Sequence, residues 1–177
     1  MKYLYYTVLL VLFICQCRHK KENTVTQFSG MPEVPSSIKK EHEYLLEKIH
    51  AITLFHDSTS LAAVKLYDLM QHHFKEEENF VLPPLGLLPL LTSAKLPEQS
   101  KAVIQLCEKL KSQLTHLNVE HQLIKAYMDE LMLAAAKDDH FEIIAFEQEL
   151  QRHAKTEEEV FFPTAILIGE YLKLKPL

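Results

Sequence analysis

Residues 103–135 read VIQLCEKLKSQLTHLNVEHQLIKAYMDELMLAA, and the spacing of their apolar side chains decides the fold class. One stripe advances in steps that alternate between four and three residues: Val103, Cys107, Leu110, Leu114, Leu117, His121, Ile124, Met128, Leu131 and Ala135. This alternation is typical of a helix whose apolar seam packs at a shallow angle against other helices, as in a four-helix bundle.

Three further segments have the same helical period. We expect the four helices to begin, in chain order, at Ser36 or Ser37, at Asp57 or Ser58, at Pro97, and at Asp138 or Asp139. We expect the second helix to stop before Pro83 and the fourth to end near Pro163. Because the links are short, neighbouring helices should be antiparallel. The sequence therefore predicts an all-α, up-down-up-down four-helix bundle over residues 36–177, built from two similar hairpins.

The link after the second helix is unusually apolar, since residues 83–91 read PPLGLLPLL. We expect this segment to fold as a cap over one end of the bundle. A docking or membrane-facing surface is the alternative, because exposed apolar patches mark interaction sites.

Composition excludes several classes of protein. A chain of 177 residues is about one domain long. Its 3 glycines are too few for a turn-rich β fold, which draws heavily on glycine in its hairpins. The net charge of −5 argues against a nucleic-acid partner, because phosphate binding needs a basic surface. The 10 histidines are more than a chain of this size usually carries, and they point to the chemistry.

The first 17 residues predict an export signal. Lys2 is followed by an apolar run over residues 3–15, shorter than the ~17–25 residues that span a bilayer. The run resembles a bacterial lipoprotein signal, in which a cysteine becomes the lipidated N-terminus, and Cys17 is the better candidate for that cysteine. An uncleaved single-span anchor is the alternative. Residues 18–35 are polar and predict a linker, so we expect a domain held at the membrane of the cell envelope.

Four histidines and two glutamates interrupt the apolar seams: His42, His73, Glu77, His121, His153 and Glu157. Each helix supplies one histidine, and the second and fourth helices each add a glutamate. Burying such groups without partners is costly, whereas a bound cation takes up the carboxylate charge and the imidazole lone pairs together. We therefore expect a buried metal site. A metal-free hydrogen-bond network in a structural bundle is the alternative.

An internal repeat supports the metal site. Residues 73–83 and 153–163 both follow the pattern H-x-K-x-E-E-x-x-x-x-P and lie 80 residues apart. The E-H pairs at 41–42 and 120–121 lie 79 residues apart. Because residues four apart share a helix face, each histidine and its glutamate should point the same way. Six ligands exceed the four that zinc prefers, so they favour two first-row ions bridged by carboxylates, iron or alternatively manganese.

These residues resemble the hemerythrin-like, or HHE cation-binding, family over residues 37–163. The resemblance implies a di-iron centre in which the four seam histidines are terminal nitrogen ligands. It also implies that Glu77 and Glu157 bridge the two irons together with an oxo or hydroxo group. The neighbouring Glu76, Glu78 and Glu158 lie off the seam, and we expect them to be solvated or to support the ligands from outside.

The chain departs from the oxygen-carrying members of this family on the third and fourth helices. Those members carry H-x-x-x-H on the third helix, where Leu117 and Lys125 stand four residues either side of His121. They carry H-x-x-x-x-D on the last helix, where Glu158 stands. The resemblance then implies fewer nitrogen ligands and an open position on each iron. This pattern argues against simple reversible oxygen carriage.

We therefore expect a non-haem di-iron protein of the cell envelope that binds or senses O2, NO or a related oxidant, or handles iron. An enzyme that reduces NO or peroxide at the open positions is an alternative. Donation of iron for iron–sulfur repair is another, although the export signal argues against an intracellular role.

Overall fold

The computed structural model describes residues 31–93, 95 and 98–176, and this part of the chain is all-α. Its α-helices are α1 (Ser36–Thr53), α2 (Ser58–Glu76), α3 (Leu88–Thr92), α4 (Ser100–Lys137), α5 (Ile143–Thr156) and α6 (Phe162–Lys173). Three short segments join them: the π-helical η1 (Glu77–Val81) and η3 (Glu157–Phe161), and the 3-10 helix η2 (Pro83–Leu87). The predicted export signal, most of the linker and Pro97 lie outside the described residues.

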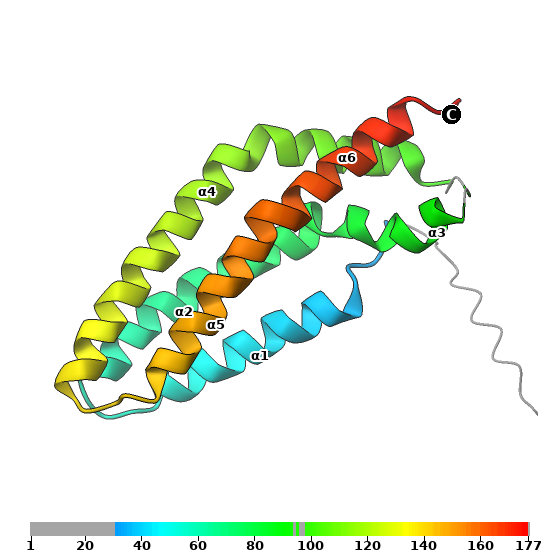
Figure 1. Cartoon of the computed structure of the whole chain (residues 1–177). Helices are drawn as coiled ribbons and strands as arrows, with labels where there is room; N and C mark the ends of the chain where they lie inside the picture. Colours follow the sequence, from blue (N-terminus) through cyan, green and yellow to red (C-terminus); the bar gives the residue numbers. More distant parts are fainter. Residues whose placement is uncertain (1–30, 94, 96–97, 177) are drawn as a thin grey trace, which may run out of the picture.

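The long helices form an up-down-up-down bundle (Figure 1). α1 packs against α2 and α5, and α2 packs against α4, which also packs against α5 and α6. The α1–α2 and α4–α5 turns lie together at one end, and α3 lies at the other (Figure 1). The predicted all-α four-helix architecture is confirmed.

Both helices of the first hairpin, α1 and α2, begin at residues predicted from the sequence. α1 starts at Ser36, directly after Pro35. Asp57 caps α2, because its carboxylate accepts a hydrogen bond from the backbone N–H of Ser60 at 3.2 Å. Such a cap satisfies one of the free N–H groups in the first turn of a helix.

The predicted start of the fourth helix at Asp138 or Asp139 is wrong, because α5 begins at Ile143. The Asp138 carboxylate instead accepts hydrogen bonds from the Ser58 hydroxyl at 2.6 Å and the Thr59 N–H at 2.9 Å. Asp139 has a φ of 63°, which no helix residue adopts. Both aspartates therefore belong to the turn between α4 and α5, and Asp138 bonds that turn to the start of α2.

The predicted end of the fourth helix near Pro163 is also wrong. Pro163 occupies the first turn of α6, where an N–H would have no acceptor inside that helix, so proline is tolerated. The chain continues as α6 to Lys173. This helix packs against α4, with five buried residues: Phe162, Ala165, Ile168, Gly169 and Leu172.

The core consists of two hydrophobic clusters. One includes Leu117 of α4 and Phe162 of α6. The other includes Leu45 of α1 and Ile124 of α4. His121 lies between Leu117 and Ile124 along α4, at the level where the two clusters part. The predicted polar seam residues therefore cross the bundle as a layer between two apolar halves.

The apolar link folds over one end of the bundle, as expected of a cap. Its buried residues are Pro83, Pro84, Leu85 and Leu87. Gly86 lies against the backbone of Glu33, where a Cβ would overlap the carbonyl oxygen. Val34 is buried in the same cluster, so packing begins slightly before the predicted boundary at residue 36. None of the described helices is both long and apolar enough to cross a bilayer.

Candidate metal centre

All six side chains predicted from the sequence meet in the polar layer, here called the buried layer. Its members are His42 of α1, His73 of α2, Glu77 of η1, His121 of α4, His153 of α5 and Glu157 of η3. Each of them has 5% or less of its surface exposed. The structure thus brings together residues that the chain separates by up to 115 positions.

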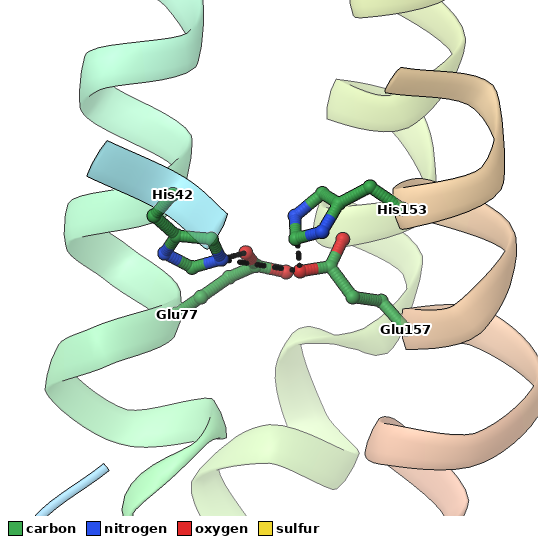
Figure 2. Close-up of side chains that lie close together, drawn as sticks. All are labelled: His42, Glu77, His153 and Glu157. Carbon is green, nitrogen blue, oxygen red and sulfur yellow. Dashed lines mark hydrogen bonds and ion pairs between the residues drawn. The ribbon is translucent and has the colours of Figure 1, made fainter. Parts of the chain in front are cut away.

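One half of the layer contains His42, Glu77, His153 and Glu157, which point toward one another (Figure 2). Nε2 of His153 lies 2.9 Å from Oε1 of Glu157, and Nε2 of His42 lies 3.4 Å from the same oxygen. Nε2 of His42 also lies 3.7 Å from Oε2 of Glu77. One nitrogen or oxygen from each of the four residues falls within 4.8 Å of the others, a spacing that one metal ion can satisfy.

The other half contains His73 and His121 with the same two glutamates, again within 4.8 Å. Nε2 of His73 lies 3.4 Å from Oε1 of Glu77, and Nε2 of His121 lies 3.5 Å from Oε2 of Glu157. The two Nε2 atoms are 2.9 Å apart. Each glutamate therefore turns one oxygen toward one histidine pair and the other oxygen toward the second pair.

The outer nitrogen of each imidazole, Nδ1, contacts a further carboxylate. The four pairs are His121–Glu158 at 2.7 Å, His42–Glu78 at 2.9 Å, His73–Glu120 at 3.0 Å and His153–Glu41 at 3.3 Å. A carboxylate that accepts the Nδ1–H fixes the ring orientation and leaves the lone pair of Nε2 directed at the centre. Glu78 and Glu158 thus lie where the sequence led us to expect supporting groups, whereas Glu76 contacts the exposed His116 instead.

Two of these supporting residues, Glu41 and Glu120, were not predicted as part of the site. Each one supports a histidine on a different helix: Glu41 of α1 contacts His153 of α5, and Glu120 of α4 contacts His73 of α2. The signal was present in the sequence, because both stand directly before a layer histidine at equivalent positions of the repeat.

A π-helical segment begins at each glutamate of the layer. The N–H of Leu82 donates to the carbonyl of Glu77 at 2.9 Å, five residues back, and Phe162 bonds in the same way to Glu157. Single π turns inside α-helices are rare and are frequently found at functional sites. Here the extra residue in the turn rotates the side chains that follow the glutamate around the helix axis. Phe80 and Phe162 are buried in the core.

Burial and charge give the two glutamates of the layer opposite pKa shifts. Burial, followed by repulsion from Glu157, raises the pKa of Glu77 well above its usual value. Burial also opposes ionisation of Glu157, but the neighbouring imidazoles of His121, His153 and His42 outweigh it and hold its pKa well below the usual range. The protein's own groups therefore accommodate one carboxylate charge in the layer more readily than two.

The residues of the layer fit a pair of metal ions. Both oxygens of Glu77 and Oε2 of Glu157 are buried and accept no hydrogen bond from the described residues. Unpartnered buried carboxylate oxygens are expensive, and a cation between the histidine pairs would satisfy them. Two imidazoles and two carboxylate oxygens per ion are a donor set suited to iron or manganese.

A comparison with known families agrees with this geometry. The family described as the hemerythrin HHE cation binding domain matches residues 34–165. No curated protein and no solved structure matches the chain. The matched range contains all six residues of the buried layer and the four carboxylates that support them. The chain therefore belongs to the hemerythrin family of HHE cation-binding domains.

Proposed function

We propose that the chain is a non-haem di-iron protein that binds or senses O2, NO or a related small oxidant. The observation that carries this proposal is the pair of overlapping ligand groups that share Glu77 and Glu157. In each shared carboxylate the two oxygens face different histidine pairs, which is the arrangement of a bridge between two ions. Mixed imidazole and carboxylate ligation favours iron, with manganese as the alternative metal.

In this proposal His42 and His153 would hold one iron, and His73 and His121 would hold the other. Each iron would also take one oxygen from each shared glutamate. Two nitrogen and two oxygen donors leave positions open on an ion that accepts six ligands. Bound iron would supply the redox chemistry and those open positions, while the carboxylates on the Nδ1 atoms would hold the imidazoles in place.

The surroundings of the layer favour a small uncharged ligand. Phe74 stacks on His42, with ring centroids 4.0 Å apart and an angle of 9° between the planes. Phe162 stacks on His121, with centroids 5.7 Å apart. These two rings give the buried layer apolar neighbours, which suit a small uncharged molecule better than a charged or bulky substrate.

Metal content tests the di-iron centre. The full-length, tag-free chain loaded with ferrous iron and desalted should retain about two irons, the number that the paired ligand sets suit. His153→Ala should lose at least one of them, because it removes a nitrogen donor from a four-donor set. Arg152→Ala is the matched control, since Arg152 is the exposed neighbour of His153 on the same helix. Less than one iron in the wild-type chain, or equal loss in both variants, would overturn the proposal.

Addition of O2 and of NO to the reduced, iron-loaded chain tests the ligand. We expect changes in the visible absorption and paramagnetic resonance spectra at close to one ligand equivalent. Unchanged spectra with both gases would overturn the sensing and binding role. Turnover of NO or peroxide in the presence of an added reductant would instead support the enzymatic alternative.

The proposed location at the cell envelope rests on the sequence of residues 1–17. Fractionation should place the full-length protein with the membranes, and labelling with a fatty acid should modify it. Cys17→Ser should abolish the label and Cys15→Ser should retain it. The reverse result would move the lipidation site to Cys15, and absence of label in the wild-type chain would favour the single-span anchor.

A further inference from the structure

A second His/Glu cluster lies outside the buried layer, on the surface shared by α2 and α4. It consists of His72 and Glu76 on α2 and His116 and Glu120 on α4. Each helix contributes the pattern H-x-x-x-E, so the histidine and glutamate of each pair share a helix face. The side chains of His72 and His116 are 62% and 46% exposed, whereas that of Glu120 is only 10% exposed. The cluster is thus open to solvent above a nearly buried carboxylate.

The four side chains are connected by contacts between the imidazoles and the carboxylates. Nδ1 of His72 lies 3.3 Å from Oε1 of Glu120, and Nε2 of His116 lies 3.6 Å from the same oxygen. Nε2 of His116 also lies 3.1 Å from Oε2 of Glu76. One ligand atom each from His72, Glu76 and Glu120 falls within 4.8 Å of the other two, the same spacing as in the buried layer. His72, Glu76 and Glu120 therefore surround a position that a single cation can occupy, and His116 lies beside this position, in contact with both carboxylates.

The internal repeat does not account for this cluster, because the other half of the chain lacks most of its residues. The equivalent positions in the other half of the chain are Arg152, Thr156, Ser37 and Glu41. Only the last of these keeps its metal-binding side chain, so one half of the bundle carries three extra ligands. Exposed histidine–glutamate pairs contribute little to stability, and stability alone does not account for placing four such residues together.

Glu120 links this surface cluster to the buried layer. Its Oε1 faces His72 and His116, while its Oε2 lies 3.0 Å from Nδ1 of His73. The Nε2 atom of the same His73 ring faces Glu77 inside the layer. A cation held at the surface would therefore stand one imidazole ring away from the buried ligands.

We propose that His72, Glu76, His116 and Glu120 form a solvent-exposed site for a first-row divalent cation, from which the cation is loaded into the buried layer. The two carboxylates attract the cation and supply oxygen donors. The two nitrogen donors favour Fe2+ or Zn2+ over Ca2+ and Mg2+, which prefer oxygen ligands. The loading role rests on the proposed di-iron function, whereas the existence of the surface site does not.

Titration of the full-length, tag-free chain with Zn2+ tests the site. The chain is first loaded with iron and desalted, so that the buried layer is filled, and Zn2+ binding is then measured by calorimetry. We expect one additional Zn2+ in the wild-type chain and a loss of affinity of at least about 100-fold in His72→Ala/His116→Ala, which removes both nitrogen donors. The matched control is His50→Ala/His56→Ala, which removes two exposed histidines elsewhere and should bind Zn2+ normally. Equal Zn2+ affinity in the two double variants would overturn the site.

Loading kinetics test the role. Iron-free chain is mixed anaerobically with Fe2+, samples are quenched with a ferrous chelator at successive times, and chelator-resistant iron is counted. Loading should slow about tenfold or more in His72→Ala/His116→Ala and remain at the wild-type rate in the control, as expected when a nearby attracting site is lost. Equal rates would overturn the loading role.

The same experiments separate failure of this proposal from failure of the di-iron function. If the wild-type chain held no chelator-resistant iron, the di-iron function would fail. Zn2+ titration of the iron-free chain would still support the surface site if binding depended on His72 and His116. Melting curves of both double variants check their folding, which exposed helix positions are not expected to disturb.

Discussion

Nδ1 of His121 lies 2.7 Å from Oε1 of Glu158, while Nε2 of the same ring faces Glu157 at 3.5 Å. The imidazole is thus held between an outer, partly exposed carboxylate and an inner, buried one. His42 has the equivalent arrangement between Glu78 and Glu157. The outer carboxylate therefore sets which nitrogen of the ring is free to bind metal, although it lies outside the layer.

Glu158→Gln should weaken metal binding without removing a ligand. The amide keeps the size of the side chain but loses the charge that holds the Nδ1–H of His121, and such changes typically cost about 10–100-fold in metal affinity. Competition with a chelator of known affinity measures the loss. Glu159→Gln is the control, because Glu159 is exposed and pairs only with Lys155 among the described residues, at 3.7 Å. Equal affinities of the two variants would contradict this role of Glu158.

The seam histidines could be predicted from the sequence because burial follows helical period. His121 lies between Leu117 and Ile124 in a regular apolar stripe, so its burial could be predicted from the sequence of its own helix alone. The same reasoning placed Glu77 and Glu157 one turn after a layer histidine. The structure brings all six residues together, and their binding of iron remains a prediction.

The supporting contacts could not be predicted in this way, because they depend on the relative register of two helices. Glu41 lies on the flank of α1 and is half exposed, yet it reaches His153 on α5. Periodicity within one helix carries no information on such a contact. The continuation past Pro163 was missed for a different reason: a proline inside a helical pattern usually ends the helix, and a π turn directly before it has no clear sequence signature.

Gly169→Ala should destabilise the contact between α4 and α6. A Cβ at this position would lie 2.5 Å from Cβ of Cys107 and 2.9 Å from its Sγ, so the two helices would have to move apart. Overpacking of this kind costs about 1–3 kcal/mol, which outweighs the gain in helix propensity of at most about 1 kcal/mol. The free energy of unfolding in urea measures the effect. Leu167→Ala, at an exposed position of the same helix, should change it by less than about 0.5 kcal/mol.

The pair formed by Asp57 and His140 should make stability depend on pH. Nε2 of His140 lies 2.7 Å from Oδ2 of Asp57, and this hydrogen bond raises the pKa of His140 and lowers that of Asp57. The contribution of His140 to the free energy of unfolding is therefore complete below its ordinary pKa of 6.5. It is lost as the pH rises through the raised pKa of the folded state. The contribution of Asp57 to the free energy of unfolding is present above its ordinary pKa of 3.8. It is lost as the pH falls through the lowered pKa of the folded state.

His140→Ala should accordingly lower the melting temperature more at about pH 5.5 than at about pH 8.5. Thermal melts of wild type and variant across this range measure the difference. His56→Ala is the control, since His56 is exposed and directly precedes Asp57 in the turn between α1 and α2. A difference between wild type and His140→Ala that stays constant or grows with pH would contradict the assigned direction.

Removal of the metal should lower the melting temperature of the whole domain. A ligand that binds only the folded state at about 1,000 times its Kd stabilises it by about 4 kcal/mol, which corresponds to roughly 10 °C in a chain of this size. Chelation under reducing conditions should therefore cause a shift of that order, because the unpartnered oxygens of Glu77 would again be buried without a cation. Glu157→Ala removes a carboxylate shared by both ligand groups, so its melting temperature should respond little to the chelator. An unchanged melting temperature in the wild-type chain would contradict a metal site inside the bundle.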